Sequence, residues 1–134
     1  MERRVIHELL HLERPLFVVD TETTGVDISR DRIVEIGFQQ WGPDGMTKEW
    51  GSLIDPLIHI PESVTKIHGI SNEKVKGWPT FKTLAANIAR GFSNCDFAGK
   101  NVRFDLRLIA VEMARSGASR VASRSVIIPR ENSS

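Results

Sequence analysis

The sequence predicts a single α/β domain in which helices pack on a mixed β-sheet. Three features predict this fold class: an apolar run that ends in an acidic residue, two segments of alternating polarity joined by turn residues, and helical patterns that enclose a short apolar segment. A chain of 134 residues is long enough for one domain with its own core and too short for two ordinary ones.

The composition is that of an ordinary globular protein. Apolar residues make up 40% and charged residues 26% of the chain, which excludes a disordered or fibrous protein. The apolar runs are far shorter than the about 20 residues of a membrane span, and the N-terminus does not resemble a secretory signal. The lone Cys95 has no partner for an internal disulfide and is expected to be buried. These features predict a cytoplasmic protein without a membrane partner.

The first part of the chain predicts a helix and three antiparallel strands. Apolar residues at helical spacing predict an amphipathic helix over residues 3–13. The apolar run at residues 16–19 predicts a central strand buried on both faces. Alternating polarity predicts a second strand over residues 32–41, and turn residues at 43–45 lead into a third strand at residues 49–54.

The rest of the chain predicts helices and short parallel strands. Helical segments are expected at residues 61–67, 81–92 and 102–115, and strand candidates at residues 95–98 and 126–128. Gly69 and Gly117 suit helix ends, and Thr80 suits an N-cap. This order predicts a ribonuclease H-like mixed sheet of three antiparallel strands plus one or two parallel strands, with flanking helices.

Two carboxylates stand at the end of the first predicted strand. Asp20 and Glu22 are two residues apart, so in a strand both side chains point to the same face. Hydrolysis of a phosphodiester requires charge to be neutralised on the attacking and leaving oxygens, which paired Mg²⁺ or Mn²⁺ ions with oxygen ligands do well. The Asp-x-Glu pair alone is a weak signal, because an Asx-type turn uses the same residues.

The surrounding residues resemble a known family. Residues 17–25, Phe-Val-Val-Asp-Thr-Glu-Thr-Thr-Gly, closely resemble the first motif of the DEDD-type (DEDDh-like) 3′–5′ exonucleases, which include the proofreading epsilon subunit of bacterial DNA polymerase III. Residues 60–71 resemble the family segment that lines the terminal-nucleotide pocket, and residues 99–105 resemble the second motif. The resemblance divides the chain into an N-terminal helix (1–14), a family-like core (15–116) and an atypical tail (117–134).

The resemblance implies a set of metal ligands. Asp20 is expected to bridge two Mg²⁺ or Mn²⁺ ions, Glu22 to bind one, and Asp105 to support the second. Asp105 also falls in the first turn of its predicted helix, where the helix dipole and the free amides favour an anion. Simple helix capping without a metal is the alternative for this residue.

The resemblance also implies contacts with the 3′ end of single-stranded DNA or RNA. The residues expected near the terminal nucleotide are Thr23, Thr24, Gly25, Ile67, His68, Asn101 and Phe104. Stacking accepts any base, so degradation independent of sequence is expected. For His68 the alternative is a helix-end residue that offsets carbonyl charge. Basic residues from Lys100 onward, which include Arg103, Arg107 and Arg115, either face phosphates or form a solvated surface. A DNA polymerase is a candidate partner, and the oligomeric state is open.

The family's third motif has no counterpart in the chain. That motif pairs a histidine, as general base, with a fourth carboxylate five residues later. After Asp105 the sequence has neither Asp nor His, and its carboxylates there are Glu112 and Glu131. We therefore expect an active site that is incomplete at its C-terminal side, as a premature or out-of-frame ending would leave it, and weak or no activity.

Two other functions are compatible with the sequence. His7-Glu8-Leu9-Leu10-His11 matches the H-E-x-x-H pattern of zinc proteases, but a catalytic zinc also needs a third ligand and a cleft, so a solvated helix face is the better interpretation. A non-catalytic module of the same fold, which binds single-stranded nucleic acid or a protein, is the serious alternative.

Overall fold

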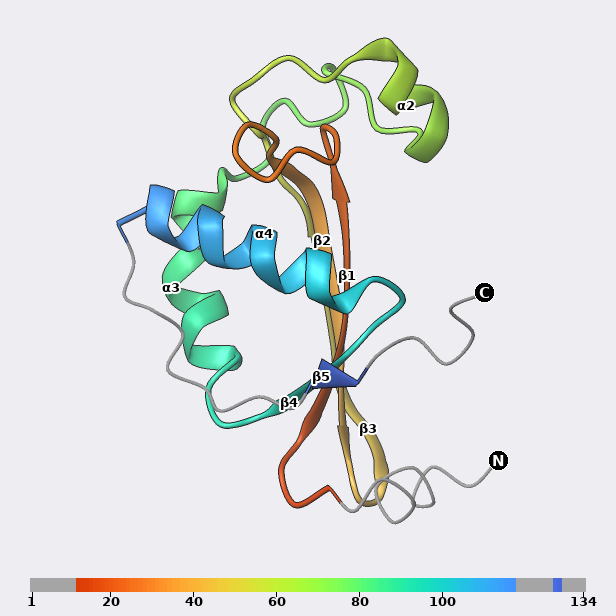
Figure 1. Ribbon diagram of the computed structural model, residues 1–134, viewed down its shortest axis with the longest axis vertical. Coiled ribbons are helices and arrows are strands. Elements are labelled where there is room, and N and C mark those ends of the chain that lie inside the picture. The colour runs from red at the N-terminus through yellow and green to blue at the C-terminus, as the bar shows by residue number, and fades with distance from the viewer. Residues whose placement is uncertain (1–11, 118–126, 129–134) are drawn as a thin grey trace.

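A computed structural model describes residues 12–117 together with the short strand at 127–128. Its centre is a five-stranded mixed sheet in the order β3-β2-β1-β4-β5 (Figure 1). The first three strands are antiparallel, and β4 and β5 run parallel to β1. The strands are β1 (Leu16–Thr23), β2 (Ile33–Gly42), β3 (Gly45–Leu53), β4 (Asp96–Ala98) and β5 (Ile127–Ile128). The predicted mixed sheet is therefore confirmed, with two parallel strands.

Strand β1 is longer than its apolar run predicts. The sequence indicated a strand that ends at Asp20, but β1 continues to Thr23 because β2 keeps pairing with it. Asp20 lies opposite Gly37, and Glu22 lies opposite Glu35. The first motif is thus held in the sheet by β2 as far as Thr23, whereas β4 pairs only with Leu16–Val18.

Two helices cover one face of the sheet (Figure 1). They are α3 (Phe81–Gly91) and α4 (Val102–Arg115). The expected cap on α3 is confirmed, since the Thr80 hydroxyl accepts from the amide of Thr83. The core between helices and sheet includes a group of packed aromatic rings, Phe17, Phe38, Phe92 and Phe97. These rings join β1, β2 and β4 to the end of α3 and fix the layers relative to each other.

Helix α2 (Glu62–His68) lies beyond one end of the sheet (Figure 1). Gly69 ends it with φ 78°, which a glycine adopts without strain, as the sequence predicted. A separate apolar cluster of Val34, Ile60, Ile70 and Val75 supports the segment. The Asn72 side chain also ties its start to its end, because it accepts from the Ile60 amide and donates to the Ile60 carbonyl.

The other face of the sheet carries polar side chains near the end of β1. Phe17 and Val19 belong to the core under the helices, so the alternation of the strand places Val18, Asp20 and Glu22 on the opposite face. Cys95 is fully buried, as expected, and burial raises its pKa to about 12. None of the helices in residues 12–117 has the length and apolar character that crossing a membrane requires.

Candidate active site

Three carboxylates gather at the end of β1 and on the neighbouring strand. Asp20 is exposed and Glu22 half-buried, and the pairing of β1 with β2 adds Glu35 directly opposite Glu22. Partial burial raises the pKa of Glu22, and the charges of Asp20 and Glu35 raise it further, while His68 and Lys100 act in the other direction. Sequence reasoning missed Glu35. The sequence showed Glu35 only as a polar position in the alternating second strand. Its place opposite Glu22 follows from the pairing of β1 with β2.

Asp105 is a buried carboxylate with an unsatisfied oxygen. The side chain is 2% exposed, the Thr21 hydroxyl donates to its Oδ1 at 2.6 Å, and Oδ2 has no hydrogen-bond partner among the described residues. Burial raises the pKa of Asp105 to about 6, the bond from Thr21 offsets part of this rise, and the charges of Asp20 and Glu22 add to it. Asp105 lies in the first turn of α4, as expected, but its burial opposes the stabilisation of the anion that the helix N-terminus was expected to provide.

The donor set suits a hard cation but does not form a compact cluster. Within residues 12–117, no group of three or more His, Cys, Asp or Glu side chains lies close enough to hold a metal ion. The buried carboxylate of α4 contacts Thr21, the residue between Asp20 and Glu22. A divalent cation would nevertheless give Oδ2 of Asp105 a partner. It would also offset the repulsion that Asp105 experiences from Asp20 and Glu22.

The turn before α4 places Asp105 beside β1. A side chain at Gly99 would put its Cβ 2.5 Å from the carbonyl oxygen of Val19, so only glycine allows this approach. Asn101 is exposed at the N-cap position, and its carbonyl accepts from the amide of Asp105 at 3.0 Å. Phe104 packs partly against the core. Of these two predicted substrate contacts, Asn101 is thus the accessible one.

The segment after β1 forms a tightly bonded loop. The Thr24 side chain is buried, and its hydroxyl donates to Asp31 Oδ1 at 2.8 Å and accepts from the amide of Arg32 at 3.0 Å. The Thr23 hydroxyl donates to the carbonyl of Gly25 at 2.6 Å. Both hydroxyls, on residues predicted to lie near the terminal nucleotide, therefore hold the loop together. The next side chain, Val26, is 85% exposed and was not predicted as part of the site.

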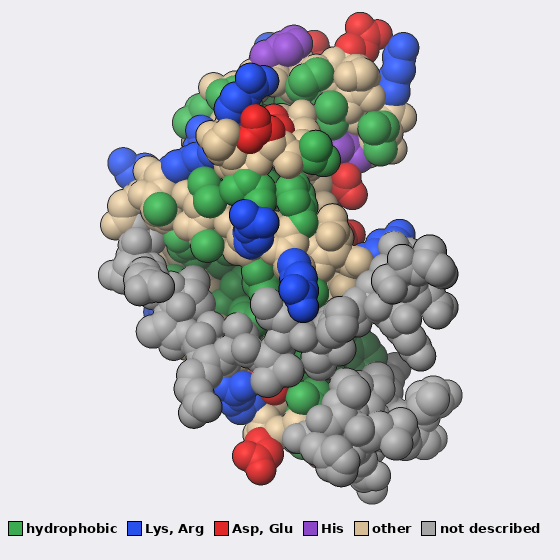
Figure 2. Space-filling view, viewed as in Figure 1, with side chains coloured by type: hydrophobic (Ala, Val, Ile, Leu, Met, Phe, Trp, Pro, Cys, Tyr) green, Lys and Arg blue, Asp and Glu red, His purple; other side chains and the backbone are tan. Residues whose placement is uncertain are grey.

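His68 connects α2 to the first motif. Its Nδ1 accepts from the amide of Ile70 at 3.1 Å, so its Nε2 carries the proton and donates to the carbonyl of Thr23 at 3.0 Å. Both ring nitrogens are engaged. The adjacent Ile67 is 83% exposed. Figure 2 shows acidic side chains and a histidine bordering the recess below α2. The structure thus brings His68, with Ile67 next to it in the chain, to the end of β1.

The predicted zinc-binding histidines and the basic residues of α4 do not belong to this group of carboxylates. His7 and His11, the basis of the protease alternative, lie outside the described residues. Arg103 and Arg107 are exposed on α4, whereas Arg115 donates to backbone carbonyls of the loop after β1. Arg115 is therefore engaged within the fold instead of facing phosphates.

Comparison with known proteins agrees with the family resemblance. A family model described as "Exonuclease" (RNase_T) matches residues 17–131, which extends past the motifs recognised in the sequence. The DNA polymerase III subunit epsilon of Rickettsia prowazekii (strain Madrid E) is 35% identical over 99 residues, which are 72% of this chain and 43% of that protein. The corresponding subunit of Treponema pallidum (strain Nichols) is 30% identical over 95 residues, which are 71% of this chain and 44% of that protein. The chain thus spans less than half the length of these curated relatives.

Solved structures show the same fold. Escherichia coli exonuclease I in complex with a dT13 oligonucleotide superposes with a TM-score of 0.71 at 18% identity, over 80% of this chain and 25% of that chain. A second structure of exonuclease I gives a TM-score of 0.76 at 16% identity, over 87% of this chain and 28% of that chain. Since the family model covers most of the 134 residues, the chain belongs to the RNase_T exonuclease family, and the resemblance to the DEDD-type exonucleases is confirmed.

Proposed function

We propose that the protein is a metal-dependent 3′–5′ exonuclease domain that acts on the 3′ end of single-stranded DNA or RNA. The observation that carries this proposal is the buried Oδ2 of Asp105, which has no partner in the part of the chain that the structure describes and lies within electrostatic range of Asp20 and Glu22. A buried oxygen without a partner costs about 1–3 kcal/mol. A folded protein tolerates such a buried oxygen where a bound ion or ligand supplies the partner.

Asp20, Glu22 and Asp105 are the residues that would hold Mg²⁺ or Mn²⁺. The bound ions would neutralise charge on the attacking and leaving oxygens of the phosphodiester. The chain's own residues prepare for this: Thr21 donates to one oxygen of Asp105, and the other oxygen has no hydrogen-bond partner among the described residues. Glu35, opposite Glu22, adds negative charge that favours cation binding.

The surroundings of the carboxylates suit a single-stranded end. Val26 and Ile67 are exposed apolar side chains on the two segments that His68 links, and apolar contact with bases does not depend on sequence. Arg103 and Arg107 supply exposed cations for backbone phosphates. Because two relatives are named as subunits of DNA polymerase III, a DNA polymerase is the candidate partner.

We propose that the 134 residues alone have weak activity. His68 lies near the carboxylates, but both of its ring nitrogens form hydrogen bonds, so it does not supply a free general base. No other His or Asp follows Asp105 in the sequence. A positioned general base contributes about 10²- to 10⁴-fold to the rate, and its absence leaves little activity above background.

Metal binding is the first test of the proposal. Titration calorimetry with Mn²⁺ should give a weak, millimolar dissociation constant, and Asp20→Ala should abolish the heat signal. Glu49→Gln is the matched control, since Glu49 is an exposed carboxylate on β3 bonded to Gln39. Binding that survives Asp20→Ala would refute the site.

Cleavage is the second test. A 3′-labelled oligonucleotide with Mn²⁺ should be degraded slowly by the 134-residue chain and not at all by Asp20→Ala or Asp105→Ala. A version extended by a family-type segment with the His and the Asp should be faster by about 10²-fold or more. If the short chain matches the extended one, a base and a ligand come from residues not identified here.

A non-catalytic module that binds single-stranded nucleic acid is the second candidate function. It is favoured by the absence of a compact metal-binding cluster among residues 12–117 and by the engaged nitrogens of His68. In that case the oligonucleotide would bind with a steep salt dependence, because phosphate contacts release counterions. Asp20→Ala would leave binding unchanged, and no product would form with the extended chain.

A further inference from the structure

Glu112 is a buried carboxylate whose oxygens are both engaged. The side chain is 1% exposed. Its Oε1 accepts from Arg32 Nε at 2.9 Å, and its Oε2 accepts from the backbone amide of Ile33 at 3.0 Å. Arg115 Nη1 lies 3.5 Å from the same Oε1. Glu112 therefore joins the last turns of α4 to the start of β2.

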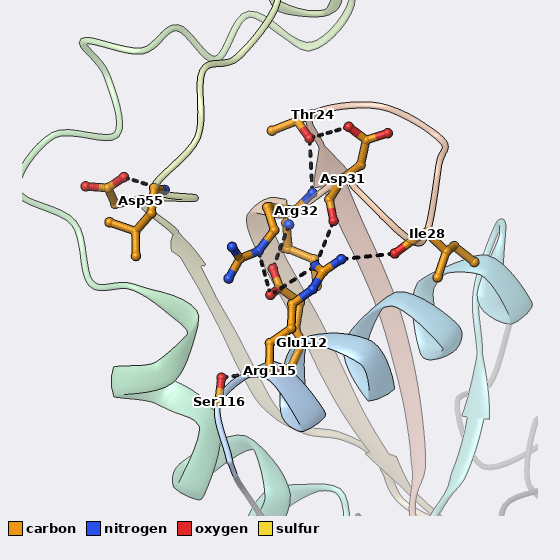
Figure 3. Close-up of polar contacts among 10 residues, drawn as sticks. Thr24, Ile28, Asp31, Arg32, Asp55, Glu112, Arg115 and Ser116 are labelled. Carbon is orange, nitrogen blue, oxygen red and sulfur yellow. Dashed lines mark hydrogen bonds and ion pairs between the residues drawn. The ribbon is translucent and has the colours of Figure 1, made fainter.

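Arg115 extends this connection to the loop between β1 and β2. Its Nη1 donates to the carbonyl of Asp31 at 2.9 Å, and its Nη2 donates to the carbonyl of Ile28 at 3.1 Å (Figure 3). The Asp31 carboxylate in turn accepts from the Thr24 hydroxyl and from the amide of Asp27. A continuous set of hydrogen bonds thus runs from α4 to Thr24, at the end of β1.

The same helix carries a proposed metal ligand. Asp105 and Glu112 are seven residues apart, which is about two helical turns, so both lie on one face of α4. The helix sets the distance between the two carboxylates. Glu112 and its arginines then set the place of residues 24–32 relative to the helix. The loop carries the exposed Val26 and borders the carboxylates of β1.

We propose that Glu112 is a positioning residue that, through Arg32 and Arg115, holds the loop over residues 24–32 so that it receives a 3′-terminal nucleotide beside Asp105. The inference rests on the proposed function, because it assigns the loop to the substrate end. Glu112 lies outside the three metal-binding motifs, and the proposal gives its charge the role of positioning this loop. In this arrangement the loop over residues 24–32 is bonded to α4, which carries the proposed metal ligand, as well as to its own strand.

The test uses two variants and a matched control in the full chain. Arg115→Met removes both loop contacts and leaves the Glu112–Arg32 pair in place, so folding should survive. Glu112→Gln keeps an acceptor for the amide of Ile33 but removes the charge. Ser116→Ala is the control, because among the described residues the Ser116 hydroxyl donates to the backbone carbonyl of Glu112 alone and contacts neither the loop nor the Glu112 carboxylate. Far-UV circular dichroism checks the folding of each variant.

The first measurement is hydrogen exchange of the amides at residues 24–31, which needs no substrate. Both variants should raise exchange there by about 10-fold, as expected for loss of a charge-assisted hydrogen bond, and the control should not. Unchanged exchange in Arg115→Met would overturn the inference whatever the chain binds.

The second measurement is preference for an end. A fluorescent oligonucleotide with a free 3′-hydroxyl is compared with a circular single strand, with Ca²⁺ in place of Mg²⁺. The native chain and Ser116→Ala should prefer the open strand, and both variants should lose about 10-fold of that preference while binding the circle equally well. A native preference that both variants keep would overturn the inference alone. A native chain without preference would overturn the proposed function, and the inference with it.

Discussion

The two buried carboxylates of α4 have opposite surroundings. Glu112 is 1% exposed, and its oxygens accept from Arg32 and from the backbone of Ile33. Asp105, two turns earlier, is 2% exposed and has one oxygen bonded to Thr21 and one without a partner in the described residues. The two side chains are thus equally buried, but Glu112 has partners for both oxygens and Asp105 has a partner for one.

The contrast separates a carboxylate that holds the fold from one that awaits a ligand. A buried charge with all its partners resists removal, because the partners are then left unpaired. A buried carboxylate without enough partners resists ionisation instead, which is why the pKa of Asp105 rises to about 6. Substitutions at the two positions should therefore change stability in opposite directions.

The largest effect is expected from Glu112→Ala. Removal of this side chain leaves Arg32 and the amide of Ile33 without their buried acceptor. We expect a loss of about 3 kcal/mol in the free energy of unfolding, measured by urea denaturation. Glu49→Ala, at an exposed carboxylate, should stay within about 0.5 kcal/mol of the native value. A loss below about 1 kcal/mol for Glu112→Ala would show that Glu112, like Asp105, does not stabilise the fold through its charge.

A smaller loss is expected from Gly99→Ala, which disturbs the Asp105 end of the helix alone. The added Cβ would lie 2.5 Å from the Val19 carbonyl, so β1 and the turn before α4 must separate. Overpacking of this kind costs about 1–3 kcal/mol. Gly91→Ala is the control, because Gly91 ends α3 and a Cβ added there would have no atom within 4 Å apart from its chain neighbours and its own helix backbone. Equal melting temperatures for Gly99→Ala and the native chain would show that the close approach is not required.

Asp105→Asn should stabilise the metal-free protein above pH 6 by about 1–3 kcal/mol, since a shift of about two pKa units corresponds to at most about 3 kcal/mol. The raised pKa means that the folded chain holds a proton on Asp105 between about pH 4 and pH 6, whereas the unfolded chain has lost it. Stability of the native chain therefore falls as pH rises through this window and levels off above pH 6. The variant lacks this fall, so its advantage should grow from pH 4 to pH 6 in denaturation curves with EDTA. An advantage independent of pH would contradict the assignment to Asp105.

The smallest effect is expected from the metal itself. With a millimolar dissociation constant, 10 mM Mg²⁺ should stabilise the native chain by about 1 kcal/mol, since a ligand of the folded state shifts the equilibrium by mass action. The rise in melting temperature should disappear in Asp105→Asn and persist in Ser116→Ala. A rise that Asp105→Asn retains would place the ion elsewhere.

Local patterns in the sequence determined most of the secondary structure and the position of the site. The order of elements, the Thr80 cap, the αL glycine at Gly69 and the two carboxylates of the first motif follow from periodicity, turn chemistry and the spacing of neighbouring residues. Such signals depend on contacts within one turn or one strand, so they are readable without the fold.

Only the tertiary structure decided which carboxylates have partners. The extension of β1 to Thr23 and the place of Glu35 depend on the pairing with β2. The bond between Arg32 and Glu112 joins residues 80 positions apart, and that between Thr21 and Asp105 joins residues 84 apart. The sequence showed Glu112 as one more helical glutamate, because burial and the identity of distant partners arise only when α4 packs on the sheet.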